Sequence, residues 1–241
     1  MKEIRLDKFL CQCLGISRKE AKDKIRKRQI TVNGQLASRP EIKIDPGKDQ
    51  VHCQEKALSY EEHHYLMLHK PQGVLSATKD ASDKTVIDLI HENYKSGLFP
   101  VGRLDKDTEG LMLLTDDGEL AHRLMAPKRH VPKSYYAEVS GRMGEADVEA
   151  FSGHLDIGGG ETAKPGILKI LETSDERSKV IITISEGKFH QVKRMVSAVG
   201  SRVLYLKRLS IGPLKLDERL ALGEYRELTK DEMDQIKELR C

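Results

Sequence analysis

The sequence predicts an α+β protein in which a small basic domain precedes a larger domain with a mixed, mainly antiparallel sheet. Three observations support this. Residues 1–60 carry 14 basic against 8 acidic side chains, whereas residues 61–241 carry 27 against 30. Helical periodicity, followed by a hairpin signal, marks the first domain. In the second, short β-type and helical runs alternate irregularly, and the regular βαβ repeat of a doubly wound fold is absent.

Composition excludes several classes of protein. The chain has 241 residues and 38% hydrophobic content, enough for two folded domains. No apolar stretch approaches the roughly 20 residues of a membrane span, and no signal-like apolar run follows Met1, so we expect a cytoplasmic protein. Four cysteines, whose spacing fits neither a zinc site nor a disulfide framework, are interpreted as reduced thiols. They are Cys11, Cys13, Cys53 and Cys241.

The first domain is predicted to begin with two helices and a hairpin. Apolar side chains recur at i, i+3, i+4 and i+7 from Leu6 to Cys13, and Gly15 is expected to end that helix. Ser17 and Glu20 have the spacing of a capping box, which predicts that a second helix starts there. An Asn-Gly turn within residues 30–36 then predicts a hairpin.

A basic cluster coincides with the second helix. Seven basic and two acidic residues lie between Arg18 and Arg28, a balance of +5. Such a cluster attracts a phosphate backbone, although a charge run can also be a solvated helix face. With the hairpin after it, residues 4–50 resemble the alpha-L RNA-binding motif. The resemblance implies RNA contacts from this domain, and the candidate residues are Arg5, Lys8, Arg18, Lys19, Lys22, Arg26, Lys27 and Arg28.

The second domain is predicted to start near His63, after a polar linker at residues 55–62. We therefore set the domains at 1–60 and 61–241. Strands are expected at Tyr65–Leu68, Leu111–Thr115, Tyr135–Val139, Val180–Ile184 and Arg202–Leu206. Helices are expected at Glu119–Met125, Glu145–Phe151 and His190–Val199, with a capped helix after Thr229.

The densest polar segment of this domain is residues 102–110, directly before an apolar run. One interpretation is a calcium loop, because acidic residues fall at suitable intervals. The residues concerned are Asp105, Asp107, Glu109, Gly110 and Asp116. The flanks read as strands where an EF-hand needs helices, so no metal site is predicted. A second interpretation is that these acids only cap turns.

Other segments give the polar run a context. Lys133-Ser134-Tyr135 opens a predicted strand, the run from Ile184 to Met195 joins a strand to a helix, and Lys70-Pro71-Gln72-Gly73 ends the domain's first strand. With residues 163–165 and 223–226, these segments resemble the pseudouridine synthases, and specifically the ribosomal small-subunit pseudouridine synthase A family. The resemblance covers almost the whole chain in the same order.

The resemblance implies a cofactor-free isomerisation of uridine to pseudouridine in ribosomal RNA. Asp105 would be the catalytic carboxylate, Lys193 its cationic partner, and Tyr135 the residue that stacks on the base. No phosphate-binding glycine motif or metal-spaced histidine cluster argues for a cofactor. The target nucleotide must leave the stack, and Arg103 is the candidate to fill the gap. Leu206 is expected against the base.

Alternatives remain open for several of these residues. Arg194, adjacent to Lys193, is a second candidate for substrate contact. A salt bridge would explain Arg103, and core packing would explain Leu206 and Tyr135. The partner is expected to be small-subunit ribosomal RNA or its assembling particle, with large-subunit RNA as an alternative. A non-catalytic ribosome-assembly factor is another. Nothing in the sequence requires more than a monomer.

Overall fold

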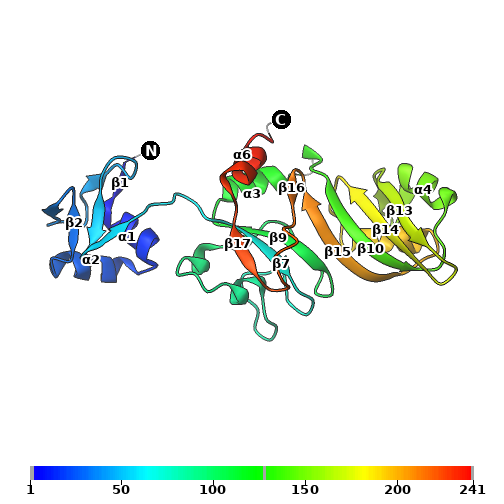
Figure 1. The fold of residues 1–241 in the computed structure, drawn as a ribbon, viewed down its shortest axis with the longest axis horizontal. Coiled ribbons are helices and arrows are strands. Elements are labelled where there is room, and N and C mark those ends of the chain that lie inside the picture. Colours follow the sequence, from blue (N-terminus) through cyan, green and yellow to red (C-terminus); the bar gives the residue numbers. More distant parts are fainter. Residues whose placement is uncertain (1–2, 127–128, 240–241) are drawn as a thin grey trace. The chain divides into compact units, whose positions relative to one another are not determined.

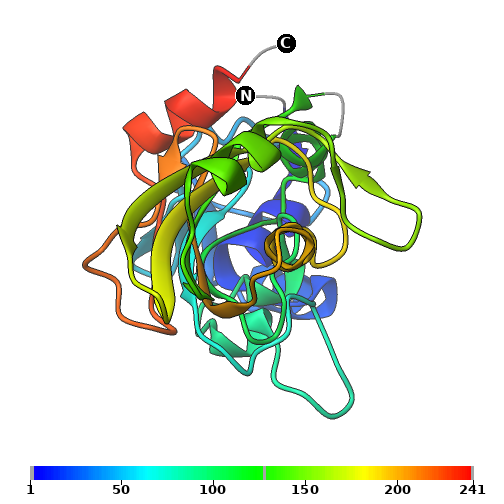
Figure 2. The ribbon, with the colours of Figure 1, turned by 90° about the vertical axis from the view of Figure 1, so that its right-hand side faces the viewer.

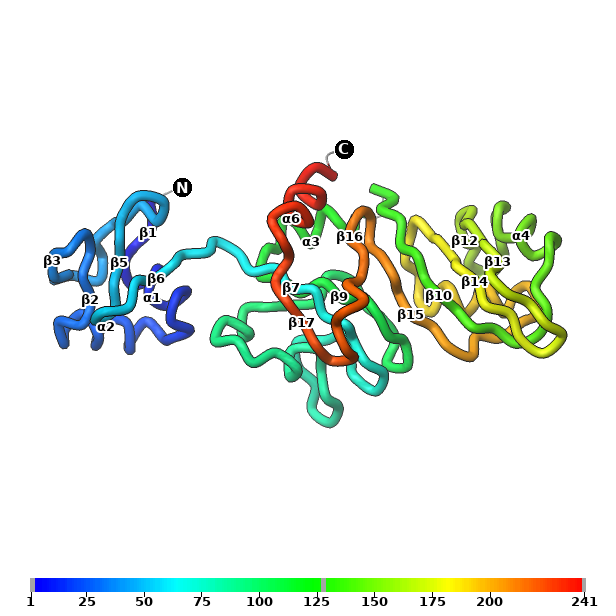
Figure 3. The backbone as a smooth tube through the Cα atoms, viewed as in Figure 1, coloured from blue at the N-terminus to red at the C-terminus, as the bar shows by residue number. Residues whose placement is uncertain are grey.

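The computed structural model describes residues 3–126 and 129–239, and the chain forms two compact units. The first comprises residues up to His64 together with residues 91–97; the second comprises residues 65–90 and the chain from Leu98 onward. The tube in Figure 3 follows this path. Residues 61–64 and 91–97, assigned to the second domain from the sequence, thus lie in the first unit. The reason is contact within that unit, since the His64 ring stacks on Tyr94 at 3.5 Å.

The first unit contains the two predicted helices. Helix α1 (Leu6–Leu14) ends at Gly15, whose φ of 62° is left-handed. A Cβ at Gly15 would lie 2.8 Å from the carbonyl oxygen of Asn93, so glycine also permits a close approach. Helix α2 (Arg18–Arg26) starts with the predicted capping box.

The strands of the first unit form two small sheets. Strand β1 (Ile4–Arg5) pairs with β4 (Lys43–Ile44), and the second sheet has the order β3-β2-β5-β6. Strands β2 (Ile30–Val32) and β3 (Gln35–Leu36) are the predicted hairpin. The core side chains come from both helices and the sheet: Leu6, Phe9, Leu10, Ala21, Ile25, Ile30, Ala37, Ile44 and Val51.

Part of the predicted linker is a strand. Residues 55–62 were expected to connect the domains, but Lys56–Leu58 form β6, which pairs with β5 (Val51–Cys53). Strand β6 is the outermost strand of its sheet, and Lys56 and Ala57 are exposed. An edge strand with solvent on its faces carries no apolar alternation, so the sequence pattern did not indicate it.

The second unit is built on one nine-stranded sheet whose main path is β13-β14-β10-β15-β9-β7-β17 (Figure 1). Every pairing is antiparallel except β15 with β9, which confirms the predicted mixed, mainly antiparallel sheet. The five predicted strands are present as β7 (Tyr65–Lys70), β9 (Glu109–Thr115), β10 (Lys133–Ser140), β14 (Arg177–Ile184) and β15 (Val203–Ile211). Figure 2 shows how strongly β14, drawn in yellow, curves.

Shorter strands complete the unit. Strands β8 (Phe99–Pro100) and β16 (Leu214–Lys215) pair with β9 and β15, and β11 (Leu155–Asp156) pairs with β12 (Thr162–Ala163) outside the main sheet. Strands β13 (Ile167–Thr173) and β17 (Tyr225–Glu227) form the two ends of the sheet path and were not predicted. Ile167 and Leu171 of β13 are largely exposed, which hides the usual strand alternation.

Among the described residues, four α-helices and two short 3-10 helices accompany these strands. The α-helices confirm the predicted ones: α3 (Gly118–Met125), α4 (Glu145–Ser152), α5 (Gln191–Ala198) and α6 (Lys230–Lys237). The 3-10 helices are η1 (Val86–Leu89) and η2 (Lys95–Gly97), the latter in the first unit. Helices α3 and α6 bury Leu120, Leu124 and Ile236 in one cluster with residues of β7 and β9. No helix among the described residues is long and apolar enough to cross a membrane.

Candidate active site

Asp105 lies in a turn immediately before β9. Its carbonyl accepts a hydrogen bond from the Thr108 amide at 3.1 Å, and the preceding Leu104 is anchored through both its amide and its carbonyl to the Ser76 hydroxyl. The polar segment is shorter than the sequence predicted, because Glu109 and Gly110 already belong to β9. The calcium-loop interpretation fails for the same reason. The Glu109 carboxylate is also occupied, since it accepts a hydrogen bond from the Tyr205 hydroxyl at 2.6 Å.

Lys70, the last residue of β7, holds this turn in place. Its side chain is fully buried at the end of β7, and Nζ donates to the carbonyls of Asp105 at 3.1 Å, Thr108 at 2.9 Å and Pro71 at 3.0 Å. Burial lowers the pKa of Lys70 to about 8, although the acidic side chains of Asp107, Asp105 and Glu109 oppose this shift. A single ammonium group therefore fixes the backbone of the turn from Asp105 to Thr108.

Gly110 fixes the other end of the turn. It has a φ of 110°, and a Cβ there would lie 2.5 Å from the backbone nitrogen of Arg208 and 2.9 Å from its carbonyl carbon. This close approach lets β9 pair in parallel with β15, where Gly110 is the partner of Arg208. Only glycine combines such a φ with the absence of a side chain. The turn is thus joined to the centre of the sheet.

The carboxylate of Asp105 faces two basic side chains from the segment that opens α5. Lys193 Nζ lies 3.1 Å from Asp105 Oδ2, and His190 Nε2 lies 3.4 Å from Asp105 Oδ1. The same ammonium group binds Asp107 Oδ1 at 2.6 Å. The Asp105 side chain is 26% exposed, so the carboxylate can be reached from solvent while it is paired.

The charges in this cluster stabilise one another. Burial lowers the pKa of Lys193, but its hydrogen bonds to Asp107 and Asp105 outweigh burial, and the pKa is raised overall. The hydrogen bond from Lys193 holds the pKa of Asp107 below its usual value. The ammonium group is therefore charged at neutral pH. A carboxylate beside an ammonium group is an arrangement that suits nucleophilic or electrostatic catalysis.

Arg194 points to a different partner. Its guanidinium donates to the carbonyls of Ile157 at 3.0 Å and Phe189 at 3.2 Å, to the Gly158 carbonyl, and to the Glu161 carboxylate. These bonds tie the β11–β12 hairpin to α5. Of these two adjacent basic residues, Lys193 contacts Asp105, whereas the guanidinium of Arg194 donates to acceptors outside the Asp105 turn.

Tyr135 and Leu206 lie on neighbouring central strands. Tyr135 of β10 is 7% exposed and pairs across the ladder with Arg208 of β15; Leu206 is 4% exposed. Arg208 is completely buried and donates to the Leu111 carbonyl at 2.8 Å. Burial lowers the pKa of Arg208, and the interaction with Tyr135 opposes that shift. Arg208 thus links the Tyr135 strand to the strand that follows Asp105.

Arg103 stands two residues before Asp105 on the surface. Its side chain is exposed and forms no ion pair with any residue that the structure describes. The salt bridge to Asp105 or Asp107 that the sequence allowed is absent from the described residues. Its guanidinium is free to meet a ligand at the edge of the Asp105 turn.

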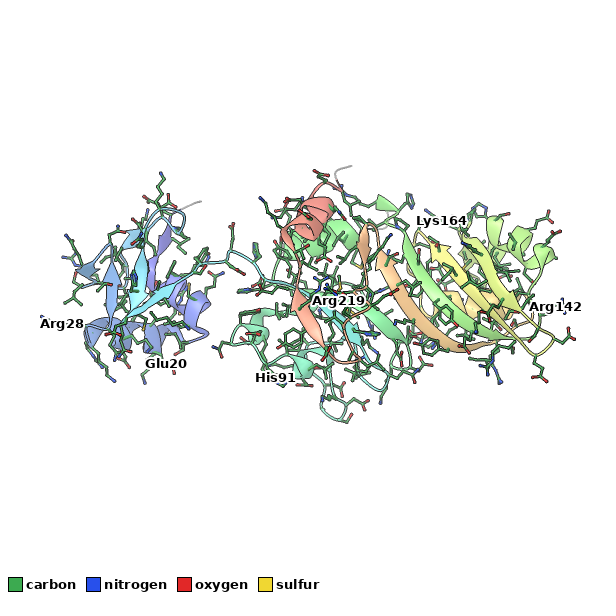
Figure 4. All side chains as sticks on the ribbon, viewed as in Figure 1. Glu20, Arg28, His91, Arg142, Lys164 and Arg219 are labelled. Atoms are coloured by element: carbon green, nitrogen blue, oxygen red, sulfur yellow. The ribbon has the colours of Figure 1, made fainter. Side chains whose placement is uncertain are left out.

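The candidate RNA-contacting side chains of the first unit are all exposed, as Arg28 illustrates in Figure 4. Two of the eight have internal partners. Arg5 binds the buried carboxylate of Asp7 at 2.7 Å, and Arg26 binds Asp23 at 2.8 Å. The remaining six basic side chains of the prediction form no ion pair with a described residue.

Comparison with known proteins shows the family of the chain. A family model described as RNA pseudouridylate synthase matches residues 64–198, and a model of the S4 domain matches residues 4–51. The chain belongs to the RNA pseudouridine synthases. A relative in Bacillus subtilis (strain 168), named an RNA pseudouridine synthase, is 44% identical over 98% of this chain and 99% of its own length. Ribosomal small subunit pseudouridine synthase A of Escherichia coli (strain K12) is 37% identical over 97% of this chain and 100% of its own length.

A solved structure supports the same conclusion for the fold. A crystal structure of a pseudouridylate synthase, 37% identical to this chain, covers 97% of it with a TM-score of 0.68. This pseudouridine synthase therefore has the predicted order of an S4 domain followed by a synthase domain, and it is an isomerase that acts on RNA. The resemblance to the family stated from the sequence motifs is confirmed.

Sequence reasoning did not include three residues of the site. Lys70 belongs to a motif that had been quoted, yet no role had been given to it, although a lysine at the end of an apolar run was a signal. His190 opened a predicted helix and lay within the quoted Ile184–Met195 motif, yet no role had been given to it. Arg208 follows the predicted strand Arg202–Leu206, and nothing local indicates that its guanidinium is buried.

Proposed function

We propose that this pseudouridine synthase isomerises a uridine of small-subunit ribosomal RNA, with Asp105 as its catalytic carboxylate. The observation that carries the proposal is the Asp105 carboxylate held between Lys193 Nζ at 3.1 Å and His190 Nε2 at 3.4 Å, on a turn anchored by the buried ammonium of Lys70. Binding to a folded RNA and chemistry on one nucleotide are then divided between the two units.

The reaction needs no cofactor. The N1–C1′ bond of uridine breaks, the detached uracil turns, a C5–C1′ bond forms, the proton on C5 leaves to solvent and N1 gains a proton. Asp105 acts either as a nucleophile or by stabilising positive charge that develops on the sugar. The ammonium group of Lys193, whose pKa is raised by the two aspartates, supplies a positive charge beside the carboxylate when RNA excludes water from the site.

The remaining site residues have proposed roles around the base. Tyr135 stacks on the uracil and takes part in proton transfer, with Arg208 fixing its side chain. Arg103 enters the gap that the flipped nucleotide leaves, which suits its exposed and unpaired guanidinium. Leu206 provides an apolar contact beside the base. Arg194 does not contact the substrate in this proposal; it positions the β11–β12 hairpin to which it is hydrogen-bonded.

The substrate proposal rests on similarity over the full length. The Escherichia coli relative that is named for the small ribosomal subunit aligns with 97% of this chain, including the S4 domain. The exposed basic side chains of α2 supply affinity for the phosphate backbone of the RNA or of its assembling particle. We further propose that the protein works as a cytoplasmic monomer.

Tritium release from uracil labelled at C5 tests both the reaction and the role of Asp105. Wild type and Asp105→Asn would be incubated with unmodified small-subunit and large-subunit ribosomal RNA. We expect release from the small-subunit RNA and a loss of about 10³-fold or more in the variant, because removal of a reacting group abolishes its whole contribution. Melting temperature of both proteins controls for folding.

Each other outcome contradicts a specific part of the proposal. Release from large-subunit RNA alone would reassign the substrate. Release that persists in Asp105→Asn would remove the catalytic role from Asp105. Tight binding without tritium release from either RNA or from precursor particles would favour the alternative that the protein is a non-catalytic ribosome-assembly factor.

A further inference from the structure

One large apolar side chain beside the candidate active site is exposed to solvent. Phe189 is 74% exposed, the highest value among the exposed large hydrophobic residues described. Two other phenylalanines, Phe9 and Phe151, are buried, and Phe99 packs against the second unit's core. A solvent-exposed phenylalanine loses the free energy of burial that the others gain. Its exposure therefore needs an explanation from outside the core.

Hydrogen bonds hold the backbone of the turn that carries Phe189. The Lys188 amide donates to the Gln191 side chain at 2.9 Å, the Gln191 amide donates to the Lys188 carbonyl at 3.2 Å, and Arg194 donates to the Phe189 carbonyl at 3.2 Å. His190 takes a left-handed backbone conformation with a φ of 47°, which is uncommon outside glycine. Several bonds thus hold an unfavourable turn with the phenyl ring outward, an arrangement that suits a functional constraint.

The ring stands one side chain away from the candidate catalytic carboxylate. The rings of Phe189 and His190 stack with centroids 3.8 Å apart and planes 18° from parallel. His190 Nε2 in turn lies 3.4 Å from Asp105 Oδ1. One face of the phenyl ring is thus covered by imidazole, and the other is available to solvent.

We propose that the outer face of Phe189 stacks an unpaired RNA base that neighbours the uridine brought to Asp105. This inference rests on the proposed function. Single-stranded nucleic acid is recognised by stacking of splayed bases on aromatic rings beside basic groups. Lys193 and the exposed Arg103 supply the basic groups here. The stack base–Phe189–His190 then sets how far along the strand the uridine lies from Asp105.

The test distinguishes aromatic stacking by Phe189 from a general apolar contact and from electrostatic binding of the RNA. Phe189→Leu keeps an apolar side chain and removes the aromatic face, whereas Phe189→Trp keeps the face. Ile167→Ala is the matched control, since Ile167 is 67% exposed on β13, at the far end of the sheet path from β9. Each change is made in wild type and in Asp105→Asn. Dissociation constants for small-subunit ribosomal RNA are measured at several salt concentrations, and KM and kcat by tritium release.

Stacking predicts a specific pattern. Phe189→Leu should raise the dissociation constant roughly 5- to 100-fold in both backgrounds, and KM by a similar factor in the background with Asp105 intact. The slope of log affinity against log salt should not change, because stacking releases no counterions. Phe189→Trp should restore wild-type values within about threefold, and Ile167→Ala should change neither. Once the modified uridine is mapped, 2-aminopurine placed on either side of it should be quenched by Asp105→Asn and less by Asp105→Asn/Phe189→Leu.

The opposite results would overturn the inference. Wild-type affinity in Phe189→Leu, a loss that tryptophan does not restore, or a changed salt slope each contradicts stacking. The proposed function fails separately, when wild type releases no tritium from any ribosomal RNA while the Phe189-dependent affinity is still measured in the Asp105→Asn background.

Discussion

The two units use positive charge in opposite ways. In the first unit, basic side chains of α2 are exposed, and most have no ion-pair partner among the described residues. In the second, three basic groups beside the Asp105 turn bind other groups of the protein, whereas Arg103 is exposed. Lys70 binds three backbone carbonyls, Lys193 binds two aspartates, and Arg208 is fully buried.

This difference separates affinity from positioning. Exposed cations on a helix attract a polyanion from any direction, and each contributes independently and in a salt-dependent way. Burial of a cation removes its hydration, and this cost is offset only when all its donors bind acceptors in the protein. A buried cation therefore stabilises the one geometry in which those acceptors surround it. Substitutions of the unpaired basic side chains in the first unit should therefore alter binding without changing stability. Substitutions around Asp105 should change stability and turnover together.

The largest effect on stability is expected at Gly110. Gly110→Ala must place a Cβ against the backbone of Arg208 at a φ of 110°, so we expect a loss of at least about 3 kcal/mol in the free energy of unfolding, measured by urea denaturation. The matched control is Gly141→Ala. Gly141 has a φ of 78° with open space around it, and its change should cost only about 1 kcal/mol. Equal losses would show that the approach of β9 to β15 does not matter.

Lys70→Met should have the next largest effect. The change removes the Lys70 donor from the carbonyls of Pro71 and Thr108 and leaves the Asp105 carbonyl with the Thr108 amide alone, which we expect to cost about 2 kcal/mol of stability. Displacement of the turn should also lower kcat about 10- to 100-fold. Lys133→Met is the comparison, because the Lys133 ammonium is also buried but donates to the Val131 carbonyl. A kcat loss in Lys133→Met as large as that in Lys70→Met would argue against a special role for Lys70.

A smaller effect, on binding alone, is expected for Lys22→Gln. Loss of one phosphate contact should reduce the slope of log affinity against log salt by about 0.7–0.9, with the free energy of unfolding unchanged within about 0.5 kcal/mol. Arg5→Gln should instead lower stability, because Arg5 pairs with the buried carboxylate of Asp7. If Lys22→Gln destabilised the protein, the exposed cluster would have a structural role.

The smallest effect is the pH dependence of the Lys193–Asp107 pair. The folded pKa of Asp107 lies below its ordinary value of 3.8, so the pair stabilises the fold above that value. The contribution should fall away as the pH decreases through the folded pKa. The stability difference between wild type and Asp107→Asn, followed by urea denaturation from pH 7 to pH 2, should therefore shrink below about pH 4. A difference that is constant with pH would contradict the ion pair.

Local signals predicted much of the fold. The capping box at Ser17, the left-handed Gly15 and the Asn-Gly turn all depend on hydrogen bonds between residues a few positions apart, and all three are present. The edge strands β6 and β13 were missed, because exposed side chains on an edge strand carry no apolar alternation.

The sequence by itself determined the two-domain α+β organisation, the family, and the candidate residue Asp105, since these follow from local periodicity and from motifs that are contiguous in the chain. Only the tertiary structure decided that Lys193 faces Asp105 while Arg194 binds the 157–161 turn. It also decided that Lys70 anchors the Asp105 turn. These contacts join residues far apart in the chain, and adjacent residues on a helix point in different directions. Their choice of partner therefore depends on where the sheet places each segment.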